Sequence, residues 1–255
     1  MESGSMVQSL QLDRFTLKTD GATISCLHYA PPIPKSRFCV VLSHGLTSSK
    51  ESMDVLASYL AEKGFPTITH DFRGHKLGGS TGELHKVMDL VLDTVAVCNI
   101  AMHRTGLHFV VPIGHSMGGI ISLAVLHGVK NAIGVGVIAS GPEPIKGFQG
   151  LAGQSLLRQR ADYIEGIPPE TTLKELGELY AGLIPSKNHP ALFIAAKDDV
   201  FAKAKPILSM AEKHGKRAEY VEVDGSHLEA PLRSRGVVTR WLEKTFGSLP
   251  YPQVK

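Results

Sequence analysis

Short runs of Val, Ile, Leu and Ala alternate with longer helical patterns through most of this 255-residue chain. The runs are nearly continuous in apolar residues, which indicates strands buried on both faces, as in a parallel sheet covered by helices. This alternation predicts an α/β fold with a mostly parallel sheet and helices on both of its faces. The strand-like runs are 37–45, 65–74, 108–114, 132–141, 190–199 and 218–227; the helical patterns are 52–64, 83–104, 116–128, 207–215 and 236–247.

The first two strand-like segments, DRFTLKT and ATISCLHYA, have a different pattern. Apolar and polar residues alternate in them, and Asp20-Gly21 between them is a hairpin signal. We therefore expect an antiparallel edge at the start of the sheet. Pro112 lies inside a run that should be a central strand, where its missing N–H predicts a bulge or a local loss of pairing.

Residues 142–189 interrupt the alternation. They are rich in Gly, Pro and charged residues and contain two amphipathic pieces, near 151–164 and 171–183. The segment is too long for an ordinary connection, and it follows a strand, where functional excursions of α/β folds tend to occur. We interpret it as a cap insertion within a single domain spanning 1–255. The alternative is a crossover helix with a long loop.

Charge and cysteine usage exclude several classes of protein. The 27 basic and 24 acidic residues are mixed along the chain, so there is no basic stripe for nucleic acid. Cys26, Cys39 and Cys98 are far apart, which argues against a disulfide scaffold or a zinc site and favours a reducing, cytoplasmic setting. We expect no signal peptide and no membrane span. We interpret Met1–Ser5 as an addition to a natural start at Met6, and the oligomeric state stays open.

The motif GHSMGG, residues 114–119, falls between a predicted strand and a predicted helix. Gly-x-Ser-x-Gly alone is weak evidence, because chains rich in glycine and serine match it by chance. In this context it predicts a sharp turn that exposes Ser116 at the carboxyl end of the sheet. A side chain at Gly114 or Gly118 would crowd the neighbouring backbone.

A serine hydroxyl needs a base beside it and an acid that orients the base. Asp198 and His227 each follow a predicted strand, in the chain order Ser, Asp, His that this kind of turn predicts. Asp199 is the alternative acid. We expect His115 to pack beside the nucleophile. The alternative for His227 is an ordinary solvated histidine.

The reaction also needs donors for the negative charge that develops on the carbonyl oxygen. His44-Gly45 follows a predicted strand, so the backbone N–H groups of Leu46 and Met117 are the candidate oxyanion hole. The alternative is that His44-Gly45 is only a turn.

These residues together resemble the α/β-hydrolases, in particular the branch of small serine esterases, monoacylglycerol lipases and feruloyl esterases. The resemblance covers residues 11–247 and rests on His44-Gly45, DFRGH, GHSMGG, KDD and GSH. It implies an eight-stranded sheet, a cap after the sixth strand, and neither cofactor nor metal. One departure is KLGGS after DFRGH, where the family often has Gly-x-Ser, so about two residues are inserted there. We interpret Asp71 and Arg73 as structural.

We therefore predict a serine carboxylic ester hydrolase that acts on a small-molecule ester through an acyl-enzyme. A cap this short favours short to medium acyl or aryl esters. Leu156 and Leu157 are the candidate substrate-binding residues. The alternatives are a serine aminopeptidase, an acyltransferase, or a slow or non-catalytic small-molecule receptor. A haloalkane dehalogenase is excluded, because that chemistry needs a carboxylate at position 116. The apolar cap residues considered for the pocket are Phe148, Leu151, Leu156, Leu157, Tyr180 and Leu183.

Overall fold

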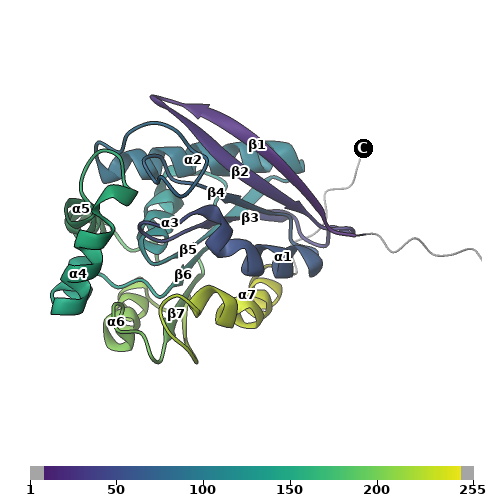
Figure 1. Cartoon of the computed structure of the whole chain (residues 1–255). Helices are drawn as coiled ribbons and strands as arrows, with labels where there is room; N and C mark the ends of the chain where they lie inside the picture. The colour runs from purple at the N-terminus through teal and green to yellow at the C-terminus, as the bar shows by residue number, and fades with distance from the viewer. Residues whose placement is uncertain (1–8, 248–255) are drawn as a thin grey trace, which may run out of the picture.

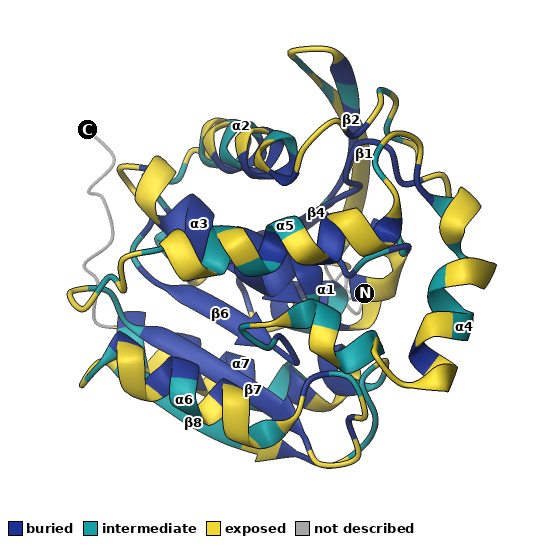
Figure 2. Ribbon diagram, turned by 90° about the vertical axis from the view of Figure 1, so that its left-hand side faces the viewer, coloured by how far each residue is buried: buried dark blue, intermediate teal, exposed yellow. Residues whose placement is uncertain are grey.

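The computed structural model describes residues 9–247, so the interpretation of Met1–Ser5 lies outside the described residues. Within them, eight strands form one sheet in the order β1-β2-β4-β3-β5-β6-β7-β8. Figure 1 labels β1 to β7, and Figure 2 labels β8 beside β7. Strand β2 is antiparallel to both of its neighbours and the other pairs are parallel, which confirms the predicted sheet and its antiparallel edge. The strands are β1 (Gln11–Thr19), β2 (Ala22–Ala30), β3 (Phe38–Ser43), β4 (Thr67–His70), β5 (Phe109–His115), β6 (Val135–Ile138), β7 (Ala191–Ala196) and β8 (Ala218–Val223).

Helices cover both faces of the sheet, and their buried sides face it (Figure 2). Helices α1 and α7 form one apolar core with the sheet, which includes Leu56 and Trp241. Helices α2, α3 and α6 form the other core, to which α5 contributes Leu173 and Leu176. The helices are α1 (Asp54–Glu62), α2 (Val87–Thr105), α3 (Met117–Gly128), α4 (Leu151–Gln159), α5 (Pro169–Gly182), α6 (Ala204–His214) and α7 (Ala230–Phe246), with 3-10 turns η1 (Lys50–Met53), η2 (Pro144–Phe148) and η3 (Ala161–Tyr163).

Pro112 lies in β5 and the structure shows how the sheet accommodates it. On the side of β6, the backbone of Val110 bonds to the segment before that strand, and regular pairing of β5 with β6 begins only at Ile113. Along a strand, polar backbone groups alternate between the two sides, so the Pro112 nitrogen faces this gap. The local loss of pairing expected from the sequence is therefore present.

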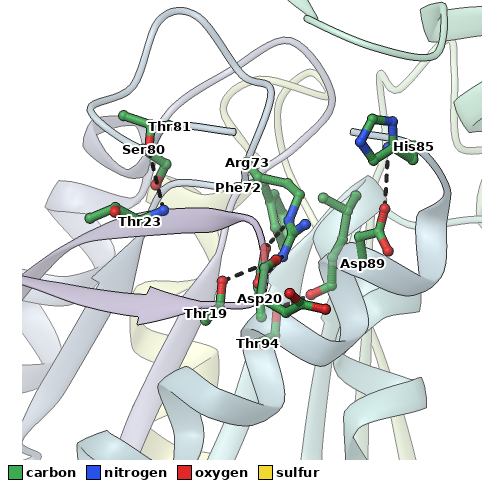
Figure 3. Close-up of polar contacts among 12 residues, drawn as sticks. Thr19, Asp20, Thr23, Phe72, Arg73, Ser80, Thr81, His85, Asp89 and Thr94 are labelled. Atoms are coloured by element: carbon green, nitrogen blue, oxygen red, sulfur yellow. Dashed lines mark hydrogen bonds and ion pairs between the residues drawn. The ribbon is translucent and has the colours of Figure 1, made fainter. Parts of the chain in front are cut away.

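Two buried ion pairs hold the loop after β4. Arg73 binds Asp93 of α2. It also donates to the Asp20 carbonyl in the β1–β2 turn (Figure 3). Asp71 binds Lys50, and both of these side chains are almost fully buried. Asp71 and Arg73 thus join separate elements, which agrees with a structural role.

Residues 142–189 connect β6 to β7 and contain η2, α4, η3 and α5. Their middle is tied to the loop after β4 by backbone bridges, His75 with Ile164 and Leu84 with Gly166. This is the loop that carries the extra residues of KLGGS. Helix α4 lies at the edge of the molecule, with mostly exposed or half-buried residues (Figure 2). The segment is therefore anchored at its ends and middle, while α4 stands apart.

Candidate active site

Ser116 lies between β5 and α3 on a turn whose backbone is strained. Its φ of 54° and ψ of −122° are unusual for a residue with a side chain. The turn packs closely on its surroundings: a Cβ at Gly114 would lie 1.9 Å from the Gly118 carbonyl oxygen, and one at Gly118 would lie 2.4 Å from that of Ser43. Neither position can hold a side chain without movement of backbone, as the motif predicts.

His227 lies on the loop between β8 and α7, beside the serine. The Ser116 hydroxyl donates to His227 Nε2 at 3.0 Å, and the His227 side chain is only 12% exposed. The preceding turn is held by the Glu229 carboxylate, which accepts hydrogen bonds from the backbone N–H and the hydroxyl of Ser226. The structure therefore brings together the two residues that the sequence paired across 111 positions.

The acid that contacts His227 is Asp199, so the choice of Asp198 is wrong by one residue. His227 Nδ1 donates to Asp199 Oδ2 at 2.7 Å, while Asp198 is exposed. The backbone N–H of Asp198 still bonds to Gly225, which extends the β7–β8 pairing and directs its side chain outwards. Asp199 Oδ1 accepts from the backbone N–H groups of Phe201 and Ala202, a turn that aspartate favours.

These contacts also set the charge of Asp199. Burial alone would raise its pKa, but the hydrogen bonds from His227 and from two backbone N–H groups hold the pKa below its ordinary value. The carboxylate is therefore ionised at neutral pH and fixes the proton of His227 on Nδ1. Nε2 is then free to accept the proton of Ser116.

His115 contacts His227 directly and helps to hold it in place. Its Nε2 donates to the His227 carbonyl at 2.9 Å, and the two rings lie 4.8 Å apart. Burial lowers the pKa of His115 to about 3, so the ring is neutral. This matches a packing role beside the nucleophile.

The loop after β3 approaches Ser116 closely. A Cβ at Gly45 would lie 3.3 Å from the Ser116 Cβ. His44 Nδ1 donates to the Gly45 carbonyl at 2.7 Å, and His44 Nε2 accepts from the Phe72 N–H. Because a trans peptide directs its C=O and N–H to opposite sides, the Leu46 N–H points away from the His44 ring. Met117 is the first residue of α3, where backbone N–H groups lack helical partners.

Two pockets meet at Ser116 and His227. The apolar pocket has a volume of 420 Å³ and lies beside the loop after β3, and a second, mixed pocket has a volume of 390 Å³ and lies beside α6. Phe148 and Phe201 stack 4.8 Å apart and line both. The apolar pocket is further lined by Leu46, Leu156, Leu157, Arg160, Leu228 and Pro231, and the polar residues of the mixed pocket include Ser140, Glu143, Lys146 and Lys203.

The cap residues considered from the sequence fall into three groups. Phe148, Leu156 and Leu157 line the apolar pocket. Leu151 is 86% exposed. Tyr180 and Leu183 line a separate cavity between α3, α5 and α6. Only one end of the cap therefore reaches the serine.

Three residues near the serine were missed by sequence reasoning. The Phe201 and His227 rings pack edge to face. Arg160 lines the apolar pocket, and Lys203 lines the second pocket. Phe201 and Lys203 follow the acid within four residues, a proximity that could have marked them, whereas no signal marked Arg160. Among residues 9–247, no His, Cys, Asp or Glu side chains form a group of three or more that could hold a metal. No helix in the same range is long and apolar enough to cross a bilayer.

Comparison with known proteins places this site in a family. A non-heme haloperoxidase of Rhodococcus erythropolis is 27% identical over 140 residues, so the match spans 49% of this chain and 50% of that protein. The fold is similar to an esterase of Pyrococcus furiosus, with a TM-score of 0.71, 20% identity, and coverage of 93% of this chain and 92% of that one.

It is also similar to a soluble variant of monoglyceride lipase from Saccharomyces cerevisiae, with a TM-score of 0.70, 16% identity, and coverage of 96% and 97%. At these identities the two structures show the shared fold alone. Residues 34–232 match the model of the family described as serine aminopeptidase, S33. The chain therefore belongs to this family of hydrolases, within the α/β-hydrolase superfamily.

Proposed function

We propose that this protein is a serine carboxylic ester hydrolase for short to medium acyl or aryl esters. One observation carries the proposal. The Ser116 hydroxyl, His227 and Asp199 form a chain of hydrogen bonds of 3.0 and 2.7 Å, at the point where two pockets meet. An ester has an acyl group on one side of its reacting carbonyl and an alcohol group on the other, and the two pockets offer a place for each.

In the first half of the reaction, Ser116 Oγ forms a bond to the carbonyl carbon, and His227 Nε2 takes the hydroxyl proton. Negative charge develops on the carbonyl oxygen. We assign the backbone N–H groups of Leu46 and Met117 as the donors that stabilise this charge. Each such donor stabilises the transition state by about 3 kcal/mol. The carbon–oxygen bond to the alcohol then breaks, and His227 returns the proton to the departing oxygen.

In the second half, water takes the place of the alcohol. His227 removes a proton from water, whose oxygen attacks the acyl carbon. The bond to Ser116 breaks, the proton returns to Ser116, and the carboxylic acid leaves. Asp199 keeps its charge throughout and holds the imidazole in one tautomer.

The pocket linings support small, uncharged esters. Apart from Arg160, the apolar pocket is lined mainly by aliphatic and aromatic side chains, and its 420 Å³ is within the range of small-molecule sites. The similar solved structures include enzymes described as an esterase and a monoglyceride lipase, in agreement with ester substrates.

The family description also raises aminopeptidase activity, which the charges in the pockets disfavour. An aminopeptidase must hold a protonated amine, for which a carboxylate is the natural partner. Among the described residues that line the two pockets, Glu143 supplies the only carboxylate, and Lys146 already binds it at 2.7 Å. We therefore favour esters over N-terminal peptides.

We also propose a cytoplasmic location. Cys26, Cys39 and Cys98 are all free thiols buried in the fold, which suits a reducing compartment.

The test is a set of p-nitrophenyl esters from acetate to palmitate, with amino-acid p-nitroanilides beside them. Ser116→Ala should lower kcat at least about 10³-fold and abolish labelling by a fluorophosphonate. Ser122→Ala, which alters another serine that is buried in α3, is the matched control. Equal turnover by wild type and Ser116→Ala would reject the nucleophile. Faster turnover of the anilides than of any ester would favour the aminopeptidase, and the absence of an acyl-enzyme burst would favour a receptor.

A further inference from the structure

Helix α4 is held to the rest of the molecule in an unusual way. It packs mainly on η2 and η3, which belong to the same cap, and Gly153 is its only buried residue. Just beyond its last residue, Arg160 extends to the loop after β3. There the guanidinium donates to Thr47 Oγ1 at 3.2 Å and to the Thr47 carbonyl at 3.5 Å.

Thr47 occupies a conformation that its side chain disfavours. Its φ is 55°, in the left-handed region, which is rare for a β-branched residue. Such a conformation persists only where its surroundings hold it. Thr47 is 5% exposed, and Arg160 donates to both its hydroxyl and its carbonyl. The contact therefore stabilises a strained segment directly beside Leu46.

We infer that Arg160 is a positioning residue that couples the closed cap to the oxyanion hole. When α4 covers the apolar pocket, the guanidinium holds Thr47, and the strained backbone directs the Leu46 N–H towards the carbonyl oxygen of the substrate. When α4 moves away, Thr47 loses this support. Full activity thus requires the cap to be in place even for substrates too small to touch it. This inference rests on the proposed function.

The deciding substrate is p-nitrophenyl acetate, whose acyl group stays near Ser116. Arg160→Met keeps the length of the side chain but removes its donors, and we expect it to lower kcat for the acetate ester about 10-fold with little change in KM. Arg160→Lys should restore part of the loss. Thr47→Val, which removes the acceptor of the 3.2 Å bond, should lower kcat in the same direction. Arg158→Met, an exposed arginine of the same helix, should stay within about two-fold of wild type.

A second measurement does not depend on turnover. Amide hydrogen exchange of residues 45–48 should be faster in Arg160→Met than in wild type and unchanged in Arg158→Met. This readout also separates the inference from the proposed function, which fails if wild type shows no activity that depends on Ser116. Unchanged exchange in Arg160→Met overturns the inference, whatever the activity.

Three kinetic outcomes would also overturn it. Arg160→Met could raise KM for long esters and leave acetate unaffected, which would make Arg160 a wall of the pocket. It could slow only esters that carry a carboxylate, which would make it a substrate-binding charge. Loss of kcat in Arg158→Met equal to that in Arg160→Met would point to a general effect on the helix.

Discussion

The floor and the roof of the active site are built differently. The floor consists of the strand ends and loops that carry Ser116, Asp199 and His227; the Asp199 side chain is fully buried and that of His227 is 12% exposed. The roof is the cap segment 142–189, whose pocket-facing side chains on α4 are half-buried. The floor supplies every group that touches a proton in the proposed reaction. We therefore propose that the chemistry resides in the floor and that the roof sets the selectivity.

The largest effect should come from the acid of the floor. Asp199→Asn should lower kcat by about 10⁴-fold, because an amide favours the wrong tautomer of the histidine. Asp198→Asn is the matched control and should stay within about two-fold, since its side chain is exposed. Steady-state kinetics with one ester measures both. A greater loss in Asp198→Asn would reject the contact between Asp199 and His227.

Acid should destabilise the protein through four buried histidines that lie at and near the active site. Burial lowers the pKa of His44 and His70 to about 4 and of His75 and His115 to about 3. Between these values and about 6.5 the unfolded chain binds more protons than the folded one, so stability present above pH 6.5 is lost as the pH falls. Each histidine removes about 1.4 kcal/mol per pH unit. The four histidines together remove about 5.6 kcal/mol per pH unit, so typical stabilities of 5–15 kcal/mol predict unfolding between about pH 5.6 and about pH 4.

Denaturant titrations at successive pH values measure this loss. His70→Gln should reduce the dependence of the free energy of unfolding on pH by roughly one proton. A free energy of unfolding that is constant from pH 7 to pH 5 would contradict the prediction.

The smallest effect should come from the roof. Each methylene that fits in the apolar pocket should raise kcat/KM about four-fold, from a burial free energy of about 0.8 kcal/mol, until the wall is reached. Leu157→Ala should move this limit to longer acyl chains and leave the rate with acetate unchanged. Leu151→Ala, at an exposed position of the same helix, should move nothing. A chain-length profile that is identical in all three proteins would show that α4 does not shape the pocket.

The floor was largely predictable from the sequence because parallel strands end at one edge of a sheet. Ser116 follows the buried strand β5 and His227 follows the mostly half-buried strand β8, so their meeting required only the order of strands that such folds adopt. The edge hairpin and the loss of pairing at Pro112 followed from local signals in the same way. These features depend on backbone geometry that short stretches of sequence determine.

Other features depend on contacts that the sequence does not display. Asp198 and Asp199 are adjacent acids in one turn, and the contacts that distinguish them, Asp198 N–H to Gly225 and the Asp199 carboxylate to Phe201 and Ala202, exist only in the folded chain. Arg160 reaches Thr47 across 113 positions, from a helix whose orientation depends on the packing of the whole cap. A charged residue near the end of an amphipathic helix has no pattern that distinguishes such a contact from an exposed position.

The backbone bridge between His75 and Ile164 has a consequence for how this enzyme can change over evolution. With the stack of Phe148 on Phe201, it fixes both ends of the stretch 149–163 independently of what lies between them. Closing a loop costs only about 0.6 kcal/mol more for each doubling of its length. The stretch can therefore be replaced by longer, shorter or differently charged sequences without loss of the fold, provided that an arginine equivalent to Arg160 is retained. New substrate ranges could then arise by insertion and deletion at one place, without any change in the reacting groups.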